Sequence, residues 1–206
     1  MPSTAEDAYD LLEASVKDPN PVIYLEHRWL HNLKVKKEPI LRVKRVIGEA
    51  RLISQGKELT IVAMGYVSVE AMHSLRYLQS VGVEAELIDI GTIVPMDWYT
   101  IFESIKKTGR LLVLDTSHEF CSVGSEIIAK VSCDMFEALK AAPIRMNLPN
   151  APEPTSYGLT GEYHVRAGHI TYWALKLLGK LELLNDISIK DSKPHDVPGD
   201  WFKGPF

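Results

Sequence analysis

Residues 59–64 read Leu-Thr-Ile-Val-Ala-Met, a short and almost uninterrupted run of apolar side chains. A strand with one face in solvent alternates apolar and polar residues, whereas a strand covered on both faces is apolar throughout. The run therefore predicts a central strand of a parallel sheet. Gly65 and Ser68 follow it and begin a segment with apolar residues at helical spacing, which predicts a helix that ends at Gly82.

Strands and helices continue to alternate along the chain. Short apolar runs predict further strands at 83–90, 111–115 and 143–148, with an edge strand at 50–54. Helical spacing predicts helices at 95–108, 124–139 and 167–178. Parallel strands joined by helices form right-handed crossovers. The predicted fold class is therefore α/β, with a doubly wound, mainly parallel sheet between two layers of helices.

The two ends of the chain have a different pattern. Ser3 and Glu6 form a capping box, which predicts a helix that runs to Asp18. Prolines end this helix, and the apolar residues 22–25 predict a short buried strand. Helix and strand make half of a βαβ unit, so we expect them to belong to a domain that begins upstream. At the other end, residues 198–202 predict a turn and an aromatic contact through which the tail packs on a surface.

Composition excludes several classes of protein. The net charge of −4 argues against general nucleic-acid binding. Seven basic residues lie between Lys34 and Arg51 without interleaved aromatics, so a solvated connector is favoured over a phosphate or RNA contact. No apolar stretch approaches the roughly 20 residues that cross a bilayer, and no signal peptide is recognisable, so no membrane partner is expected. We expect a cytoplasmic protein with Cys121 and Cys133 reduced.

The loop 115–124 carries the largest number of reactive side chains, and it follows a predicted strand, where α/β proteins bind ligands. Cys121 with His118 as its base suggests a nucleophile. No third group is available to orient the pair, so a loop that caps a helix or meets a partner is favoured. Asp115 is interpreted as an acceptor for backbone amides rather than a general base. The loop 65–68 has one glycine where a dinucleotide fingerprint needs three.

The histidines suggest a metal site, but their spacing supports it weakly. Glu26, His27 and His31 can form a facial set if the segment is helical. The segment directly follows a predicted strand, so structural or interface histidines are the favoured interpretation. His164 and His169 have no recognisable ligand spacing.

Several stretches, read together, resemble one protein family. They are Met1–Thr4, Asp18–His27, Gly56–Val62, Glu86–Asp89, Val123–Ile127, Ala142–Arg145, Pro152 and Pro154–Tyr157. In this order and spacing they resemble the β subunit of the thiamine-diphosphate-dependent component of 2-oxo acid dehydrogenases. The resemblance covers nearly the whole chain and implies a transketolase C-terminal domain, a Rossmann-like three-layer sandwich. The loop 118–121 and the tail depart from the family pattern.

The resemblance implies an enzyme whose chemistry lies elsewhere. In the family, a 2-oxo acid is decarboxylated on thiamine diphosphate and the acyl group passes to lipoamide. The Gly-Asp-Gly motif that holds diphosphate and Mg²⁺ has no counterpart here, since Gly199-Asp200 is followed by Trp201. The activating Glu and the active-site His of the family lie upstream. We therefore expect no catalytic or cofactor-binding residue in this chain, thiamine diphosphate and Mg²⁺ in the parent enzyme only, and an inactive isolated chain.

The resemblance also implies an assembly and dimerisation role. The expected partners are a second β subunit, the α subunit and the subunit-binding domain of the acyltransferase. His118, Glu119 and Phe120 are the expected partner-binding residues, because a polar loop with an exposed aromatic suits an interface. The expected domains are a pyrimidine-binding remnant (1–33), a basic linker (34–50), the transketolase C-terminal-like domain (51–180) and a tail (181–206). The alternative is a free-standing α/β protein that binds a small molecule or nucleotide with the Asp115–Gly124 loop.

Overall fold

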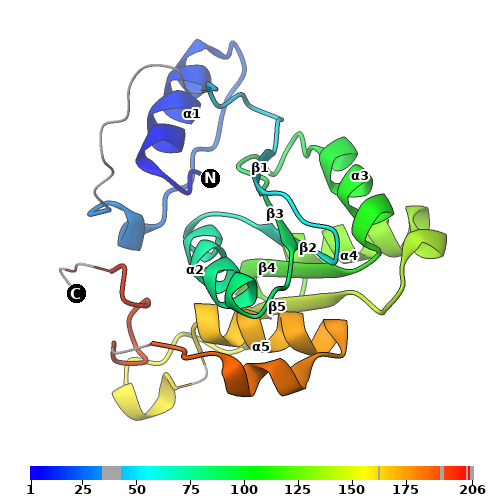
Figure 1. Cartoon of the computed structure of the whole chain (residues 1–206). Helices are drawn as coiled ribbons and strands as arrows, with labels where there is room; N and C mark the ends of the chain where they lie inside the picture. Colours follow the sequence, from blue (N-terminus) through cyan, green and yellow to red (C-terminus); the bar gives the residue numbers. More distant parts are fainter. Residues whose placement is uncertain (34–42, 162, 191–192, 203, 205–206) are drawn as a thin grey trace.

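The computed structural model describes residues 1–33, 43–161, 163–190, 193–202 and 204, so part of the predicted basic linker lies outside it. A five-stranded sheet of order β1-β3-β2-β4-β5 forms the centre (Figure 1). The strands are β1 (Arg51–Ser54), β2 (Leu59–Ala63), β3 (Ala85–Asp89), β4 (Leu111–His118) and β5 (Ile144–Leu148). All run parallel except β1, which pairs antiparallel with β3. The predicted doubly wound, mainly parallel sheet is confirmed.

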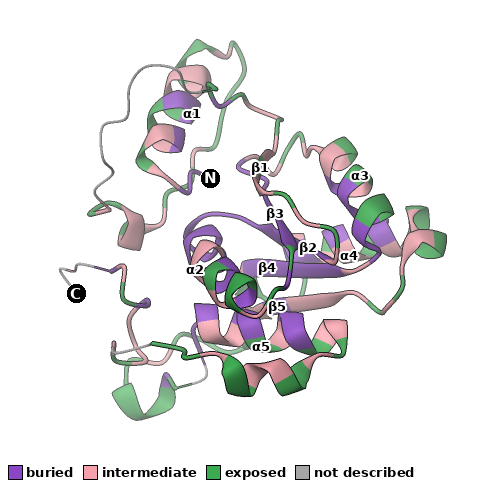
Figure 2. Ribbon diagram, in the orientation of Figure 1, coloured by how far each residue is buried: buried purple, intermediate pink, exposed green. Residues whose placement is uncertain are grey.

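Helices cover both faces of the sheet. They are α2 (Tyr66–Ser80) and α5 (Ala167–Leu178) on one face, and α3 (Trp98–Thr108) and α4 (Val123–Asp134) on the other. In β2, Leu59 and Ile61 face α2 and α5, whereas Val62 faces α3 and α4. Every residue of β2 is buried, as Figure 2 shows for the centre of the sheet. Burial on both faces is the reason that this strand is apolar except for Thr60.

The one polar residue of β2 has partners on α3. The Thr60 hydroxyl lies 2.6 Å from the Ser104 hydroxyl and 2.7 Å from the Thr108 hydroxyl. A buried hydroxyl without a partner costs about 1–3 kcal/mol. The two hydroxyls of α3 therefore allow a threonine in a fully buried strand.

The helix that was predicted to reach Leu139 ends earlier. α4 stops at Asp134, and a 3₁₀ turn, η2 (Phe136–Ala138), follows. The Lys140 amide then donates to the carbonyl of Gly109, just before β4, at 2.7 Å. The chain must return to this end of β4 so that Ile144 can pair with Leu112 in the parallel ladder. A longer α4 would carry the chain past the start of β4.

The N-terminal segment lies outside the sheet (Figure 1). α1 (Ala5–Lys17) confirms the predicted helix, but its N-cap is Thr4 rather than Ser3, since the Thr4 hydroxyl accepts a hydrogen bond from the Asp7 amide. The prediction of a buried strand at 22–25 is wrong. These residues form no strand, and Ile23 is 87% exposed. An apolar run forms a strand only beside another strand, and no described strand is adjacent to this one.

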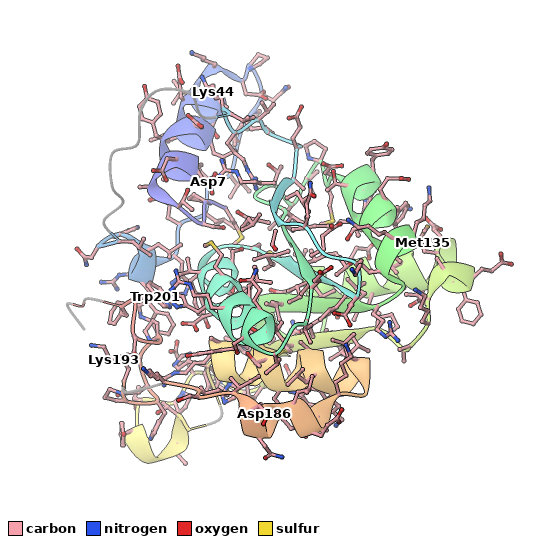
Figure 3. The ribbon with its side chains drawn as sticks, in the orientation of Figure 1. Asp7, Lys44, Met135, Asp186, Lys193 and Trp201 are labelled. Atoms are coloured by element: carbon pink, nitrogen blue, oxygen red, sulfur yellow. The ribbon has the colours of Figure 1, made fainter. Side chains whose placement is uncertain are left out.

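Buried charges attach α1 to the sheet. The Asp10 carboxylate accepts the backbone N–H of Arg45 at 2.9 Å. The Arg45 guanidinium donates to the carbonyl of Asp89, at the end of β3, and lies 3.6 Å from its carboxylate. Asp7 forms an ion pair with Arg51 at 2.7 Å, and Figure 3 shows Asp7 on the side of α1 that faces the sheet. The contact between α1 and the sheet is therefore largely polar.

The C-terminal tail packs on the surface of the fold, as predicted, and the structure shows that it contacts α2 and the start of α5. The buried Glu70 carboxylate of α2 accepts hydrogen bonds from the amides of Ala167 and Gly199 and from the Trp201 indole, at 2.9, 3.1 and 2.6 Å. Arg166 donates to the backbone carbonyls of Lys193, Pro194 and Val197. Two further 3₁₀ segments, η3 (Tyr157–Leu159) and η4 (Leu181–Asp186), lie before and after α5. Within the described residues, no helix is both long and apolar enough to cross a membrane.

Candidate functional site

A cavity of about 440 Å³ opens at the carboxyl edge of the parallel strands. From β2 the chain crosses to β3 on one side and then to β4 on the other, so the strand order reverses at β2. Open α/β sheets bind ligands in the crevice at this reversal. We call the cavity the carboxyl-edge crevice. Its lining residues are Glu26, His27, Arg28, Trp29, Tyr66, Thr116, Leu148, Glu153 and His164.

Aromatic rings form one wall of the crevice. Trp29 belongs to a short 3₁₀ turn, η1 (Arg28–Leu30), which lies with the C-terminal tail beside α2 (Figure 1). Its ring centroid is 4.9 Å from that of Tyr66 and 5.0 Å from those of His27 and His164. The His27 and Tyr66 centroids are 4.5 Å apart. Residues distant in the sequence thus meet around Trp29, and the ring centroid of the buried Phe202, in the tail, lies 6.2 Å from that of Trp29.

Both histidines of the wall favour the neutral state. Burial, together with smaller effects of the neighbouring His164 and His31, lowers the pKa of His27 to about 4. Burial likewise lowers the pKa of His164, although Glu153, 3.5 Å away, opposes the shift. At neutral pH the two imidazoles are therefore uncharged aromatic rings.

The Tyr66 hydroxyl is buried beside these rings. Tyr66 is 2% exposed, and among the described residues its hydroxyl has no hydrogen-bond partner. Burial raises the pKa of Tyr66, and the nearby carboxylates of Glu70 and Glu153 raise it further. The hydroxyl thus keeps its proton and has hydrogen-bonding capacity to offer a ligand or a water molecule.

The structure does not assemble the suggested metal site. His31 lies 3.7 Å from Glu26 at the surface, whereas His27 packs on Tyr66 and accepts the Trp29 amide as the N-cap of η1. His169 does not line the crevice. In the described part of the chain, no three His, Cys, Asp or Glu residues are grouped so as to hold a metal ion. His27 has the structural role that was favoured over metal binding.

The 115–124 loop caps α4. The buried Asp115 carboxylate accepts the amide of Ser117 at 2.9 Å and that of Gly124 at 2.8 Å, which confirms its predicted role as an acceptor for backbone amides. The Ser122 hydroxyl accepts the Ser125 amide at 3.0 Å. Cys121 is exposed with φ 55, and no hydrogen bond joins it to His118 within the described residues. The geometry gives the nucleophile hypothesis no support.

His118, Glu119 and Phe120 lie together at the surface, where β4 extends beyond its predicted end. All three are exposed, and Phe120 is 79% exposed. The carbonyl of Glu119 accepts hydrogen bonds from Arg145 at 2.6 Å and from the Ser125 hydroxyl at 2.9 Å, so the loop has a defined conformation. Their role at an interface stays a prediction.

Sequence analysis placed ligand sites after the strands but missed most of the crevice. Tyr66 lies three residues after the end of the central strand, and this position was its only signal. Trp29 and Glu153 reach the site from distant segments, and nothing in their local sequence indicates this. In the sequence, Glu70 cannot be distinguished from an ordinary polar residue of a helix, although its carboxylate binds the tail.

The chain is similar to a known domain family and to a solved structure of the same type. Residues 48–170 match the family model described as the C-terminal domain of transketolase. Among solved structures, a "split gene transketolase, inactive beta4 tetramer" aligns with a TM-score of 0.58 at 20% identity, over 70% of this chain and 46% of that one. The likeness to that structure concerns the fold alone.

Curated relatives are β subunits of larger enzymes. The pyruvate dehydrogenase E1 component subunit beta of Rhizobium meliloti is 37% identical over 77% of this chain and 35% of its own length. The acetoin:2,6-dichlorophenolindophenol oxidoreductase subunit beta of Cupriavidus necator is 34% identical over 86% of this chain and 52% of its own length. The corresponding pyruvate dehydrogenase subunit of Mycoplasma pneumoniae is 36% identical over 81% and 51%. The chain spans about half the length of the curated relatives it matches, or less.

Proposed function

Because the chain belongs to the transketolase C-terminal domain family, we propose that it is the C-terminal assembly and dimerisation domain of a 2-oxo acid dehydrogenase β subunit of the pyruvate dehydrogenase type. The parent enzyme would decarboxylate a 2-oxo acid on thiamine diphosphate and transfer the acyl group to lipoamide. The carrying observation is the similarity to β subunits over more than three quarters of this chain.

The proposal divides the chain as the sequence suggested, with a pyrimidine-binding remnant at 1–33, a linker at 34–50, the main domain at 51–180 and a tail at 181–206. The family match at 48–170 supports the main domain. The position of α1 outside the sheet supports a separate N-terminal part. The tail, although packed on the main domain, lies outside the family match.

Thiamine diphosphate and its Mg²⁺ do not fit the carboxyl-edge crevice. The carboxylates of Glu26 and Glu153 line it, and Arg28 is its only lining residue with a permanent positive charge. A diphosphate requires several amides or cations, and Mg²⁺ requires grouped oxygen ligands. Accordingly, we assign the cofactor to the rest of the parent enzyme and derive no step of its chemistry from this chain.

The proposed partners are a second β subunit, the α subunit and the subunit-binding domain of the acyltransferase, in the cytoplasm. The exposed loop of His118, Glu119 and Phe120 supports an interface on this side of the domain. A large exposed aromatic beside polar groups is typical of residues that contribute strongly to protein interfaces. The alternative function, a free-standing binding protein that uses the 115–124 loop, loses support because Asp115 is occupied by two backbone amides.

Sedimentation velocity with a matched pair of variants tests the proposal. We expect the chain to sediment as a dimer, and Phe120→Ser to weaken dimerisation or the binding of the subunit-binding domain. Phe136→Ser removes a phenyl ring that is similarly exposed, on η2, and should change neither. A monomer that binds no acyltransferase domain would contradict the assembly role. Turnover of pyruvate by the chain with thiamine diphosphate and Mg²⁺ alone would contradict its inactivity.

A further inference from the structure

We propose that the carboxyl-edge crevice binds a small organic ammonium ion, held between aromatic rings and two carboxylates. This site goes beyond the assembly role and is independent of it. The crevice has the volume of a small-molecule site and lies at the strand-order reversal, where α/β folds place ligands. The side chains that line the crevice determine which class of ligand it can bind.

The aromatic wall favours a cation. The centroids of Tyr66 and of the uncharged rings of His27 and His164 each lie within 5.0 Å of the Trp29 ring at the cavity. The faces of such rings carry negative potential, and clusters of them are the usual binding site of organic ammonium groups. The two imidazoles add no competing charge at neutral pH, because burial favours their neutral form.

The charged groups of the lining favour the same class. Glu26 and Glu153 bring two negative charges to the crevice, against the single positive charge of Arg28. Glu153 lies 3.5 Å from His164, so its charge is next to the aromatic wall. An anionic ligand would be repelled by the pair of carboxylates, whereas an ammonium ion would be attracted.

The buried Tyr66 hydroxyl supplies a specific contact. It has no hydrogen-bond partner among the described residues, and its phenolic oxygen can accept an N–H from a primary ammonium group. An unpartnered buried hydroxyl is costly, so a ligand that satisfies it gains affinity. We therefore expect a primary ammonium to bind more tightly than a neutral molecule of the same shape.

The tail keeps the wall in position. Phe202 packs against Trp29, and the adjacent Trp201 donates to Glu70 on α2. Figure 3 shows Trp201 beside η1, the turn to which Trp29 belongs. The crevice is thus preformed, and binding need not order a loop.

Isothermal titration of the whole chain tests the proposal with three probes of similar size, n-butylammonium chloride, 1-butanol and sodium butyrate, at matched ionic strength. We expect only butylammonium to bind measurably, or to bind at least tenfold more tightly than the other two probes. Equal binding of butanol would show a merely apolar cavity. Preferred binding of butyrate, or binding of none of the three probes, would likewise overturn the proposal.

Variants locate the site. Trp29→Leu should weaken butylammonium binding about fivefold or more, and Glu153→Gln about two- to fivefold. Trp173→Phe alters a tryptophan of α5 outside the crevice, and Glu182→Gln alters an exposed carboxylate of η4, so neither should change binding. Near-ultraviolet circular dichroism verifies that each variant is folded. If folded Glu153→Gln and Tyr66→Phe both bind as the unaltered chain does, the assigned contacts are wrong.

Discussion

The sheet is stabilised by apolar packing, whereas the N-terminal segment is attached to it mainly by polar contacts. In β2 every residue is buried, and the strand is covered by apolar side chains from helices on both faces. α1 instead contacts the sheet through Asp7, Asp10 and Arg45. Its Tyr9 and Val16 are exposed, and Figure 2 shows exposed segments along this helix. The sheet has the core of an independent domain. The N-terminal segment has a polar contact on one side and unburied apolar side chains on the other, which supports the proposed division between residues 1–33 and the main domain.

The largest expected effect comes from the core. Ile61→Ala removes a fully buried side chain of β2 and should lower the free energy of unfolding by about 3 kcal/mol. Ile23→Ala, in the N-terminal segment, should lower it by about 0.5 kcal/mol or less. Urea denaturation followed by circular dichroism measures both. Equal losses would show that the two regions do not differ as described.

A smaller effect is expected where α1 meets the sheet. Arg45→Met leaves the buried Asp89 without its cation and should destabilise the contact by about 2 kcal/mol. Burial raises the pKa of Asp89 and Arg45 opposes this, so in the variant Asp89 takes up a proton, which limits the loss. Tryptic cleavage after Lys17 should accelerate at least about tenfold.

The control is Lys44→Met, which removes an exposed ion pair with Glu13 at the outer side of α1. Figure 3 shows Lys44 at the far end of α1 from the sheet. Cleavage after Lys17 should keep its rate in this variant, because exposed pairs contribute little. Acceleration by both variants alike would mean that α1 is held by overall charge rather than by the buried contact.

The tail should loosen when Glu70 loses its charge. Glu70→Gln removes the charge that accepts three hydrogen bonds and should weaken the packing of the tail by about 1.5 kcal/mol. Hydrogen exchange measured by mass spectrometry should then be faster in residues 194–202 and unchanged in β2. Unchanged exchange in 194–202 would show that the contacts of Arg166 are sufficient to hold the tail.

The smallest expected effect is a pH dependence from the crevice. The pKa of His27 is about 4 in the folded chain, below its ordinary 6.5. Between these values the unfolded chain binds a proton that the folded chain does not, so stability falls as the pH decreases from 7 to 4. The loss is about 1 kcal/mol, since His27 is partly exposed. His27→Asn keeps an N-cap acceptor for η1 and should lose less stability between pH 7 and pH 5 in urea denaturation. An equal loss would contradict this role of His27.

Local patterns predicted the sheet region well and the N-terminal segment poorly. α5 occupies the predicted residues 167–178, and β2 lies within the predicted run, because burial on one or two faces leaves a periodic signal. Residues 22–25 carry the same apolar signal but have no neighbouring strand in the described chain. The composition of the crevice could not be predicted from the sequence for a related reason. Its position follows from strand order, but the meeting of Trp29, Tyr66 and His164 depends on long-range packing that no local pattern encodes.

Native-state hydrogen exchange tests the central claim, that the sheet is a self-contained domain to which α1 is attached by a polar contact. Exchange of the α1 and β2 amides is measured in the unaltered chain at neutral pH over increasing urea concentration. We expect the β2 amides to exchange only through global unfolding, and the α1 amides to exchange through a local opening of much lower free energy. Identical opening free energies for α1 and β2, with the same urea dependence, would contradict the claim.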